Sequence, residues 1–295
     1  MSGKDVSVPV VLKTPAKLNL CLRILGLRAD GYHELITWMQ QISLYDEVRI
    51  EPGGRRILVY ADRDDVPGGR ENIVHRAARA LRKASGRKGL GARIYLKKNI
   101  PAGGGLGGGS GNAAGALWAL NRVWSLGMRK AELSEVAARV GSDVPFFLAG
   151  PAAVCRGRGE RVEVKEALKS GWFLLVKPPV ALSTQDVYGW SRQKLGREGR
   201  NFEGQSGPAR LGRYEYGNDL QEIVFPRFPE LESLCGMLVR HGAARAMMSG
   251  SGSTIFGIFR RKEEAERAAS RIKKSEKGKE CECFLATPLQ EMCFQ

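Results

Sequence analysis

The pattern of apolar and polar positions divides the chain into short strands and helices without an internal repeat. Residues 8–12 and 18–25 are rich in alternating and β-branched positions, which predicts two strands with a break at 13–16. Apolar residues at helical spacing predict helices over 72–84 and 132–140. Further strands are expected at 47–51, 56–61, 92–97, 152–164, 172–177, 254–259 and 281–286, and further helices from 184, at 219–224 and 230–241, and after 260.

A glycine-rich stretch lies between the strand predicted at 92–97 and a further helix. Seven glycines occur from Gly103 to Gly111, and Ala113 and Leu117 then begin an apolar stripe at helical spacing. Glycine permits positive φ and removes side chains that would keep a ligand off the backbone. Several N–H groups can therefore converge at the helix N-terminus, where the helix dipole adds positive potential. The stretch predicts a cradle for a polyphosphate.

Three other interpretations fit this stretch less well than a polyphosphate cradle: a flexible linker, a Walker A loop and a protein-kinase loop. A linker is rarely flanked so closely by a patterned strand and a patterned helix. No Lys-Ser/Thr pair closes the loop as in a Walker A sequence, and neither H-R-D nor D-F-G follows, as a protein kinase requires. A G-x-G-x-x-G match at Gly103, Gly105 and Gly108 carries little weight in so glycine-dense a segment.

Two groups of polar residues stand beside predicted elements. Lys17 and Asn19 share one face of a strand, so an ammonium and a carboxamide point into the same space. Asp143 follows Gly141 and precedes Pro145, where a carboxylate either caps a new helix or serves a rigidly held site. Taken alone, Lys17 and Asn19 fit a solvent-facing pair on an edge strand, and both interpretations of Asp143 stay open.

The segment 27–35 contains an Asp-Gly turn that presents Tyr32 next to His33. Taken alone, it fits a hairpin turn whose tyrosine covers the core. The segment 196–217 is polar and rich in glycine and arginine, which predicts a loop, and a further glycine cluster at 248–253 precedes a strand.

Length and composition indicate a soluble protein with two lobes. A chain of 295 residues can bury two ordinary cores, and a composition shift near 167–171 is the candidate boundary. No apolar run approaches the length of a membrane span and residues 1–11 lack a signal-peptide core, so we expect a cytoplasmic protein. Six scattered cysteines predict reduced thiols, and no histidine stands at zinc-ligand spacing from Cys281 and Cys283.

The net charge of +16 indicates attraction to nucleic acid, to an acidic surface or to anionic small molecules. In 260–279, Lys and Arg alternate with Glu around a stripe of Ala265, Ala268 and Ile272, as on a solvated helix face. Aromatic residues that would stack bases are missing from this stretch. No nucleic-acid partner is therefore expected. Nucleic-acid binding is kept only as the alternative from another class of function.

Four motifs in this order and spacing resemble the kinases named after galactokinase, homoserine kinase, mevalonate kinase and phosphomevalonate kinase. They are P-A-K-L-N at 15–19 with A-D-G-Y-H at 29–33, the glycine loop at 101–114, G-S-D-V-P at 141–145 and S-G-S-G at 249–252. The first motif resembles the branch of that family that acts on a cytidine diphosphate-linked polyol of the non-mevalonate isoprenoid pathway. The resemblance spans about the whole chain.

The resemblance implies an α+β fold in two lobes: an N-terminal ATP-binding lobe, 1–166, similar to ribosomal protein S5 domain 2, and a ferredoxin-like substrate lobe, 167–295. It implies phosphoryl transfer from ATP, with Mg²⁺ as the ATP complex, to a hydroxyl of a cytidine diphosphate-linked polyol. A kinase of the same family for another alcohol, such as mevalonate or homoserine, is the alternative. No membrane partner is expected.

The resemblance also implies roles for residues at matching positions. Asp143 takes the place of the catalytic base and Lys17 that of its partner. Gly111-Asn112 departs from a frequent Ser-Asp pair in the loop, so no metal ligand is carried over to this chain. The implied binding positions are Asn19, Tyr32, His33, Tyr188, Gly250 and Ser251 for the alcohol substrate, and Asn72, Lys98, Pro101, Gly103, Gly104, Gly105, Leu106, Gly107, Gly108, Gly109 and Ser110 for ATP.

Overall fold

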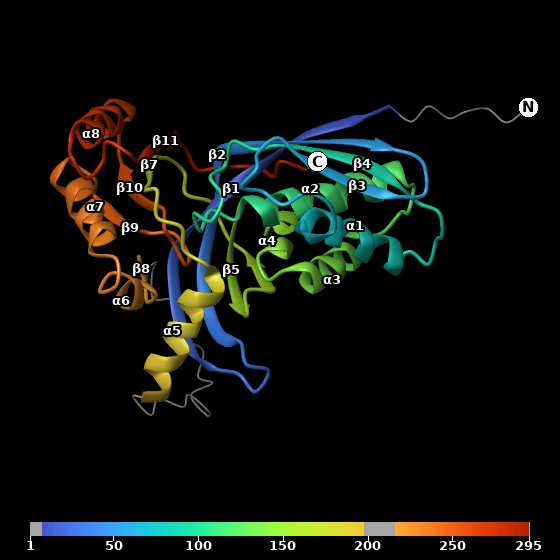
Figure 1. The fold of residues 1–295 in the computed structure, drawn as a ribbon, viewed down its shortest axis with the longest axis horizontal. Coiled ribbons are helices and arrows are strands. Elements are labelled where there is room, and N and C mark those ends of the chain that lie inside the picture. Colours follow the sequence, from blue (N-terminus) through green and yellow to red (C-terminus); the bar gives the residue numbers. More distant parts are fainter. Residues whose placement is uncertain (1–7, 198–215, 295) are drawn as a thin grey trace, which may run out of the picture.

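The computed structural model describes residues 8–197 and 216–294, and it has two sheets with helices packed on each (Figure 1). The predicted α+β class and its two lobes are confirmed. The loop predicted at 196–217 lies almost wholly outside the described residues. No helix in the described ranges is both long and apolar enough to cross a membrane.

The first sheet is organised around a long antiparallel hairpin of β1 (Val10–Leu27) and β2 (His33–Pro52). The break predicted at 13–16 is wrong, because β1 continues through it. A register shift between Pro15 and Ala16 accommodates the proline, which cannot donate to the ladder. The strand order is β3-β4-β2-β1-β8, with β5 paired to β2 and β6 to β5. The remaining strands are β3 (Ile57–Ala61), β4 (Ala92–Lys97), β5 (Ala152–Gly157), β6 (Arg161–Val164) and β8 (Gly217–Asn218).

β2 is much longer than the strand predicted at 47–51. Its middle carries Gln40 and Gln41, which are buried polar residues and disguise the apolar pattern. Their side-chain amides donate to the main-chain oxygens of Pro151 and Gly150, so burial leaves these donors satisfied.

Helices cover one face of the first sheet, and their apolar residues form its core with the inward side chains of β1, β2 and β4 (Figure 1). The helical spacing of Val74, Ala77, Ala78 and Leu81 accounts for the first of them. These helices are α1 (Ile73–Ala84), α2 (Gly108–Val123), α3 (Lys130–Val140) and α4 (Val144–Ala149), with the 3₁₀ turn η1 (Gly69–Glu71) before α1.

The second sheet has the antiparallel order β11-β7-β10-β9. Its strands are β7 (Trp172–Lys177), β9 (Arg245–Met248), β10 (Ile255–Phe259) and β11 (Glu282–Ala286). The sequence did not predict β9, whose polar first residue and two methionines give a weak strand signal. The helices of this lobe are α5 (Thr184–Arg197), α6 (Gln221–Val224), α7 (Pro229–Arg240) and α8 (Lys262–Lys274).

Two segments beyond residue 167 join the first lobe. β8 pairs with β1 in parallel, and Phe294 is buried in the core beneath the first sheet. The boundary predicted between 166 and 167 falls between β6 and β7, and it stays a prediction.

Candidate active site

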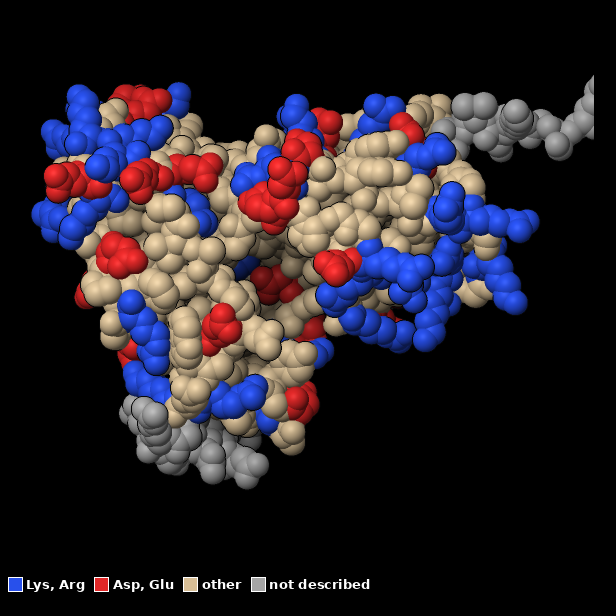
Figure 2. Space-filling view, viewed as in Figure 1, with Lys and Arg blue, Asp and Glu red and all other residues tan. Residues whose placement is uncertain are grey.

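A cleft of about 1360 Å³ opens between the two lobes, and it appears as the hollow at the centre of Figure 2. The first lobe contributes β1, the glycine loop and the start of α4. The second contributes Gly250 and Ser251, and Tyr188 reaches the cleft from α5. Every site residue predicted from the sequence lines this one cleft, although the residues are spread over most of the chain.

Lys17 occupies the buried floor of the cleft. Its ammonium donates hydrogen bonds to the side-chain oxygen of Asn19 and, at 2.8 Å, to the carbonyl oxygen of Gly105. It also lies 3.6 Å from a carboxylate oxygen of Asp143. Burial lowers the pKa of the Lys17 ammonium, and the Asp143 carboxylate opposes that shift. One cation therefore joins the glycine loop, Asn19 and the carboxylate.

Asp143 stands at the N-cap position of α4, but its side chain makes no capping hydrogen bond. The interpretation of this carboxylate as a helix cap is therefore wrong. Gly141, which ends α3, has extended backbone with φ of −174°. The side chain of Asp143 is 34% exposed and faces the cleft beside Lys17.

The glycine loop needs glycine at several positions. Gly103, Gly105 and Gly107 have φ of 61°, 72° and 69°, a region that other residues rarely adopt. A Cβ on Gly105 would stand 2.0 Å from the carbonyl oxygen of Ser249, so this loop packs directly on the second glycine cluster. α2 then begins without a side-chain cap, and its first residues, Gly108 to Ser110, line the cleft. The geometry suits a phosphate group.

The second glycine cluster is held by residues that the sequence did not single out. The amide of Asn218 donates to the carbonyl oxygens of Met248 and Gly250, at 2.9 and 2.7 Å. The hydroxyls of Thr184 and Ser251 share a hydrogen bond of 2.9 Å at the cleft wall. Their partners lie far away in sequence, so no local pattern could have revealed them.

Asn72 and Lys98 line the cleft, but their polar atoms already have protein partners. Asn72 caps α1: its oxygen accepts from the Val74 N–H at 2.8 Å. The Lys98 ammonium is buried in an ion pair with Asp46 and donates to the Asn112 oxygen at 2.8 Å. The roles of Asn72 and Lys98 near adenine stay predictions.

Asn112, where the loop departs from the family pattern, is among the residues that line the cleft, but its side chain is only 1% exposed. Besides accepting from Lys98, it donates to Thr14 at 2.7 Å and to Asp46 at 3.0 Å. A Cβ on the neighbouring Gly111 would lie 2.7 Å from the carbonyl oxygen of Pro15. This pair therefore packs α2 against β1.

His33 and Tyr188 form one wall of the cleft. Their ring centroids are 5.1 Å apart with the planes tilted by 48°. His33 is buried, and its Nε2 has no hydrogen-bond partner among the described residues. Burial, and then Arg192, lower the pKa of His33, so its ring is neutral near pH 7. An unpartnered ring nitrogen on a residue that lines a cleft is available to a polar ligand.

Tyr32 lies at the mouth of the cleft and is 53% exposed. The guanidinium of Arg158 stacks over its ring, 4.7 Å from the centroid. The expectation that Tyr32 covers the core is wrong, and its free face is open to a planar ligand. Arg158 comes from the turn between β5 and β6, a connection whose sequence gives no functional signal.

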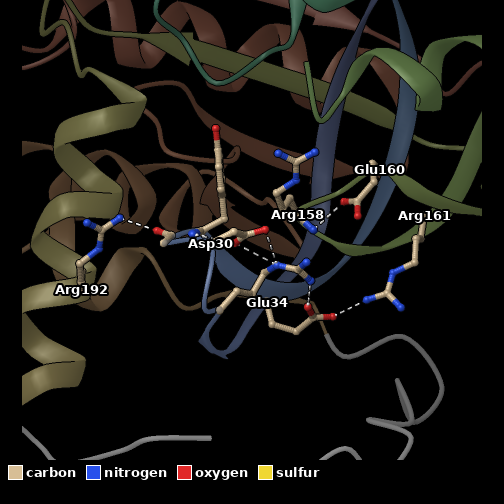
Figure 3. A network of polar contacts seen from close by, with 9 residues as sticks. Asp30, Glu34, Arg158, Glu160, Arg161 and Arg192 are labelled. Carbon is tan, nitrogen blue, oxygen red and sulfur yellow. Dashed lines mark hydrogen bonds and ion pairs between the residues drawn. The ribbon is translucent and has the colours of Figure 1, made fainter. Parts of the chain in front are cut away.

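A network of ion pairs fixes the hairpin turn that carries Tyr32 and His33 (Figure 3). Glu34 accepts from Arg28 at 2.5 Å and from Arg161 at 2.7 Å, which ties the turn to β6. Arg192 of α5 donates to the carbonyl oxygen of Gly31. The turn is therefore held from both lobes.

A two-lobed α+β fold, a glycine loop at a helix N-terminus and a Lys-Asp pair in the cleft define a small-molecule kinase. Two family models match the chain: GHMP kinases N terminal domain over residues 72–151 and GHMP kinases C terminal over 205–278. Together they span more than half of the chain.

Individual relatives narrow the class. The chain is 41% identical to a 4-diphosphocytidyl-2-C-methyl-D-erythritol kinase of Pelotomaculum thermopropionicum, with 88% of this chain and 93% of that protein covered. It is 40% identical to the kinase of that name from Syntrophus aciditrophicus, over 86% of this chain and 91% of that protein. A crystal structure of 4-(cytidine 5'-diphospho)-2C-methyl-D-erythritol kinase superposes with a TM-score of 0.74 at 34% identity, covering 95% of this chain and 99% of that one.

A homoserine kinase from Cytophaga hutchinsonii has a TM-score of 0.71 at 18% identity and shares the fold alone. The chain belongs to the GHMP kinase family and, within it, to the family of 4-diphosphocytidyl-2-C-methyl-D-erythritol kinases. It is an ATP-dependent small-molecule phosphotransferase, as the sequence predicted.

Proposed function

We propose that this protein transfers the γ-phosphoryl group of ATP to a hydroxyl of 4-diphosphocytidyl-2-C-methyl-D-erythritol, a step of the non-mevalonate isoprenoid pathway. The observation that carries the choice of alcohol is the unpartnered Nε2 of His33, buried beside Tyr188 in the cleft that also holds Lys17 and Asp143. A cytosine ring offers both a polar edge and an aromatic face to such a wall. Mevalonate and homoserine have no ring to place there.

Asp143 is the proposed general base. Phosphoryl transfer needs an in-line hydroxyl, neutralised phosphate charge and an acceptor for the hydroxyl proton. The Asp143 carboxylate is the acidic group next to Lys17 in the cleft, and no capping bond engages it. Lys17 is buried between this carboxylate and the glycine loop, so it is placed to stabilise negative charge on the transferring group.

The loop from Gly103 to Gly109 and the N-terminus of α2 are proposed to hold the ATP phosphates through backbone N–H groups. Cytosine is proposed to stack on Tyr32 or Tyr188 while His33 addresses its edge. Asn19, Gly250 and Ser251 also line the cleft, and the polyol and its diphosphate are proposed to lie beside them and Lys17.

The residues fit a Mg²⁺ ion that enters with ATP. Within the described residues, no group of three or more His, Cys, Asp or Glu side chains could hold a metal, and the Asn112 oxygen is engaged by Lys98. Such an ion is typically bound through phosphate oxygens, water and one or two carboxylates. In this cleft the carboxylate beside Lys17 is that of Asp143. It would neutralise phosphate charge. Cytoplasmic location and the absence of a nucleic-acid partner stay predictions.

A coupled ADP-release assay tests the proposal. The purified protein is supplied with ATP, Mg²⁺ and in turn 4-diphosphocytidyl-2-C-methyl-D-erythritol, mevalonate and homoserine, and the Asp143→Asn variant measures background hydrolysis of ATP. We expect ADP release above background with the cytidyl substrate alone. Faster turnover of mevalonate or homoserine would replace the proposal with another kinase of the family.

A further inference from the structure

The cleft that receives anionic substrates is itself lined by more carboxylates than cations. Among the described residues, the cations are Lys17, Lys98, Arg158 and Arg192, and the carboxylates are Asp30, Asp65, Glu71, Asp143 and Asp186. Ion pairs engage both signs: Lys17 and Lys98 pair with Asp143 and Asp46, and Asp30 and Asp65 pair with Arg28 and Arg63, which do not line the cleft. The charged lining alone therefore gives no long-range attraction for a polyanion such as ATP.

The surplus of positive charge lies instead on the first lobe. Residues 66–93 contain eight Lys and Arg and one acidic residue, Glu71, which is +7 of the net +16. Figure 2 shows blue side chains gathered on this lobe beside the central hollow. We call the exposed cations of residues 70–88 the α1 surface: Arg70, Arg76, Arg79, Lys83, Arg87 and Lys88.

The cations of the α1 surface differ from those of α8, the other basic helix, in their ion pairing. On α8, Arg261 pairs with Glu264 at 2.8 Å and Lys262 with Glu266 at 3.3 Å. In the described part of the chain, no ion pair reaches the α1 surface. Arg76, Arg79 and Lys83 stand at i, i+3 and i+7 on one helix face, where like charges repel. Among the described residues, no ion pair offsets this repulsion between the cations.

The α1 surface begins at the rim of the cleft. Asn72 and Ile73, at the start of α1, line the cleft. The helix extends about 18 Å from there, at ~1.5 Å per residue. Arg76 follows Ile73 by three residues, about 4.5 Å along the helix axis and so within the Debye length of about 8 Å at physiological ionic strength, and the later cations come into range at lower salt. Its field therefore reaches the entrance of the nucleotide site.

We propose that the α1 surface steers ATP electrostatically into the cleft and so raises the association rate of the nucleotide. A one-signed cationic surface beside a cleft raises the local concentration of a polyanion before contact and increases association rates by about 10- to 1000-fold. No residue of the α1 surface lines the cleft. This inference rests on the proposed function only in taking ATP as the phosphoryl donor.

The test reverses charges that have no structural task. Arg76 donates to the Val140 carbonyl oxygen and Arg82 to the Leu90 carbonyl oxygen, so both are left intact. The variant Arg79→Glu/Lys83→Glu changes two exposed side chains of α1, and the matched control Arg267→Glu/Arg271→Glu makes the same change in charge on α8. Stopped-flow fluorescence then measures association of an ATP analogue labelled on the ribose.

At about 20 mM salt, we expect the α1 variant to bind the analogue about 3- to 10-fold more slowly than the parent protein, and the α8 variant to stay within about twofold. At about 0.5 M salt, all three rates should converge, with the dissociation rate unchanged. The rate of turnover with saturating substrates should also be unchanged, which separates this test from that of the proposed function.

Buried His75 provides a second readout. Burial, and then Arg79, Arg70 and Arg82, lower its pKa. NMR titration of the α1 variant should show that pKa move upward, which verifies that the field was changed. Given that shift, an unchanged association rate would overturn the proposal. Equal slowing in the α8 variant, or a deficit that persists at high salt, would overturn it as well.

Discussion

The ammonium of Lys17 and the carboxylate of Asp143 lie 3.6 Å apart, although one residue belongs to β1 and the other begins α4. Lys17 is buried and needs a counter-charge, while Asp143 is open to the cleft and makes no capping bond. The pair therefore joins a rigid strand to the place where a substrate hydroxyl can enter.

Asp143→Asn should lower kcat by about 10²- to 10⁴-fold, the usual cost of removing a general base, while ATP still binds. The melting temperature should fall, because the buried Lys17 ammonium loses its counter-charge, although no helix cap is lost. Steady-state kinetics and nucleotide titration of the variant check this. Near-normal turnover would show that Asp143 is not the base.

Lys17→Ala should also slow turnover, because the charge beside the transferring group is lost.

Gly105→Val should weaken ATP binding by about tenfold or more, because a Cβ at this position meets the carbonyl oxygen of Ser249 at 2.0 Å and forces the two glycine clusters apart. Gly127→Val is the matched control: its φ is also positive, at 64°, nothing lies within 4 Å of the added Cβ, and it does not line the cleft. Both variants share a backbone strain of about 1 to 2 kcal/mol. Isothermal titration with ATP should separate them, and equal affinities would place the cradle elsewhere.

Tyr32→Ala and His33→Ala should each raise the KM for the cytidyl substrate by about one to two orders of magnitude, since a base stack or a buried hydrogen bond contributes roughly 1 to 3 kcal/mol. The KM for ATP and the melting temperature of the Tyr32 variant should stay near normal, because Tyr32 is half exposed. Tyr60→Ala is the control, an exposed tyrosine stacked on Tyr95 outside the cleft. An unchanged KM in both cleft variants would contradict a cytosine pocket.

The affinity for the cytidyl substrate should fall in acid. Because burial lowers the pKa of His33 below its ordinary value of 6.5, the neutral ring persists at pH 7, and protonation removes the acceptor on Nε2 only as pH falls below 6.5. KM for the cytidyl substrate should thus be constant above that value and rise below it. In the His33→Gln variant, this rise of KM below pH 6.5 should vanish. A rise of the same size in that variant would assign the effect to another group.

The lowered pKa of His33 also makes the free energy of unfolding depend on pH. A depressed folded-state pKa means that the unfolded chain binds the proton first, so the stabilisation from neutral His33 is present above 6.5 and decreases as pH falls toward the folded-state pKa. Urea unfolding of the parent protein and His33→Gln across this range measures the difference between them.

Lys98→Met should destabilise the fold by about 3 to 5 kcal/mol, because it leaves the carboxylate of Asp46 buried without its cation. Asp46 would keep hydrogen bonds from the N–H groups of Asn99 and Ile100, at 2.8 Å each. Urea unfolding provides the measurement. A normal unfolding free energy combined with a tenfold higher KM for ATP would instead support a role of Lys98 at the nucleotide.

Much of the architecture could be predicted from local patterns. The period of apolar residues identified α1, β4 and β7 almost to the residue, because each packs one face on a core and depends on few distant contacts. The same reasoning failed for β2, where the buried amides of Gln40 and Gln41 are satisfied by chain segments far away in sequence.

By itself, the sequence determined the family, the glycine loop and the residue types of the site, since these depend on local conformational preferences and on motifs of fixed spacing. Only the tertiary structure decided that Asp143 faces Lys17 and caps no helix, that Arg158 covers one face of Tyr32, and that unpaired cations gather beside the cleft. The physical reason is range: backbone propensity acts over a few residues, whereas ion pairs, ring stacking and surface potential depend on distances set by the folding of remote segments.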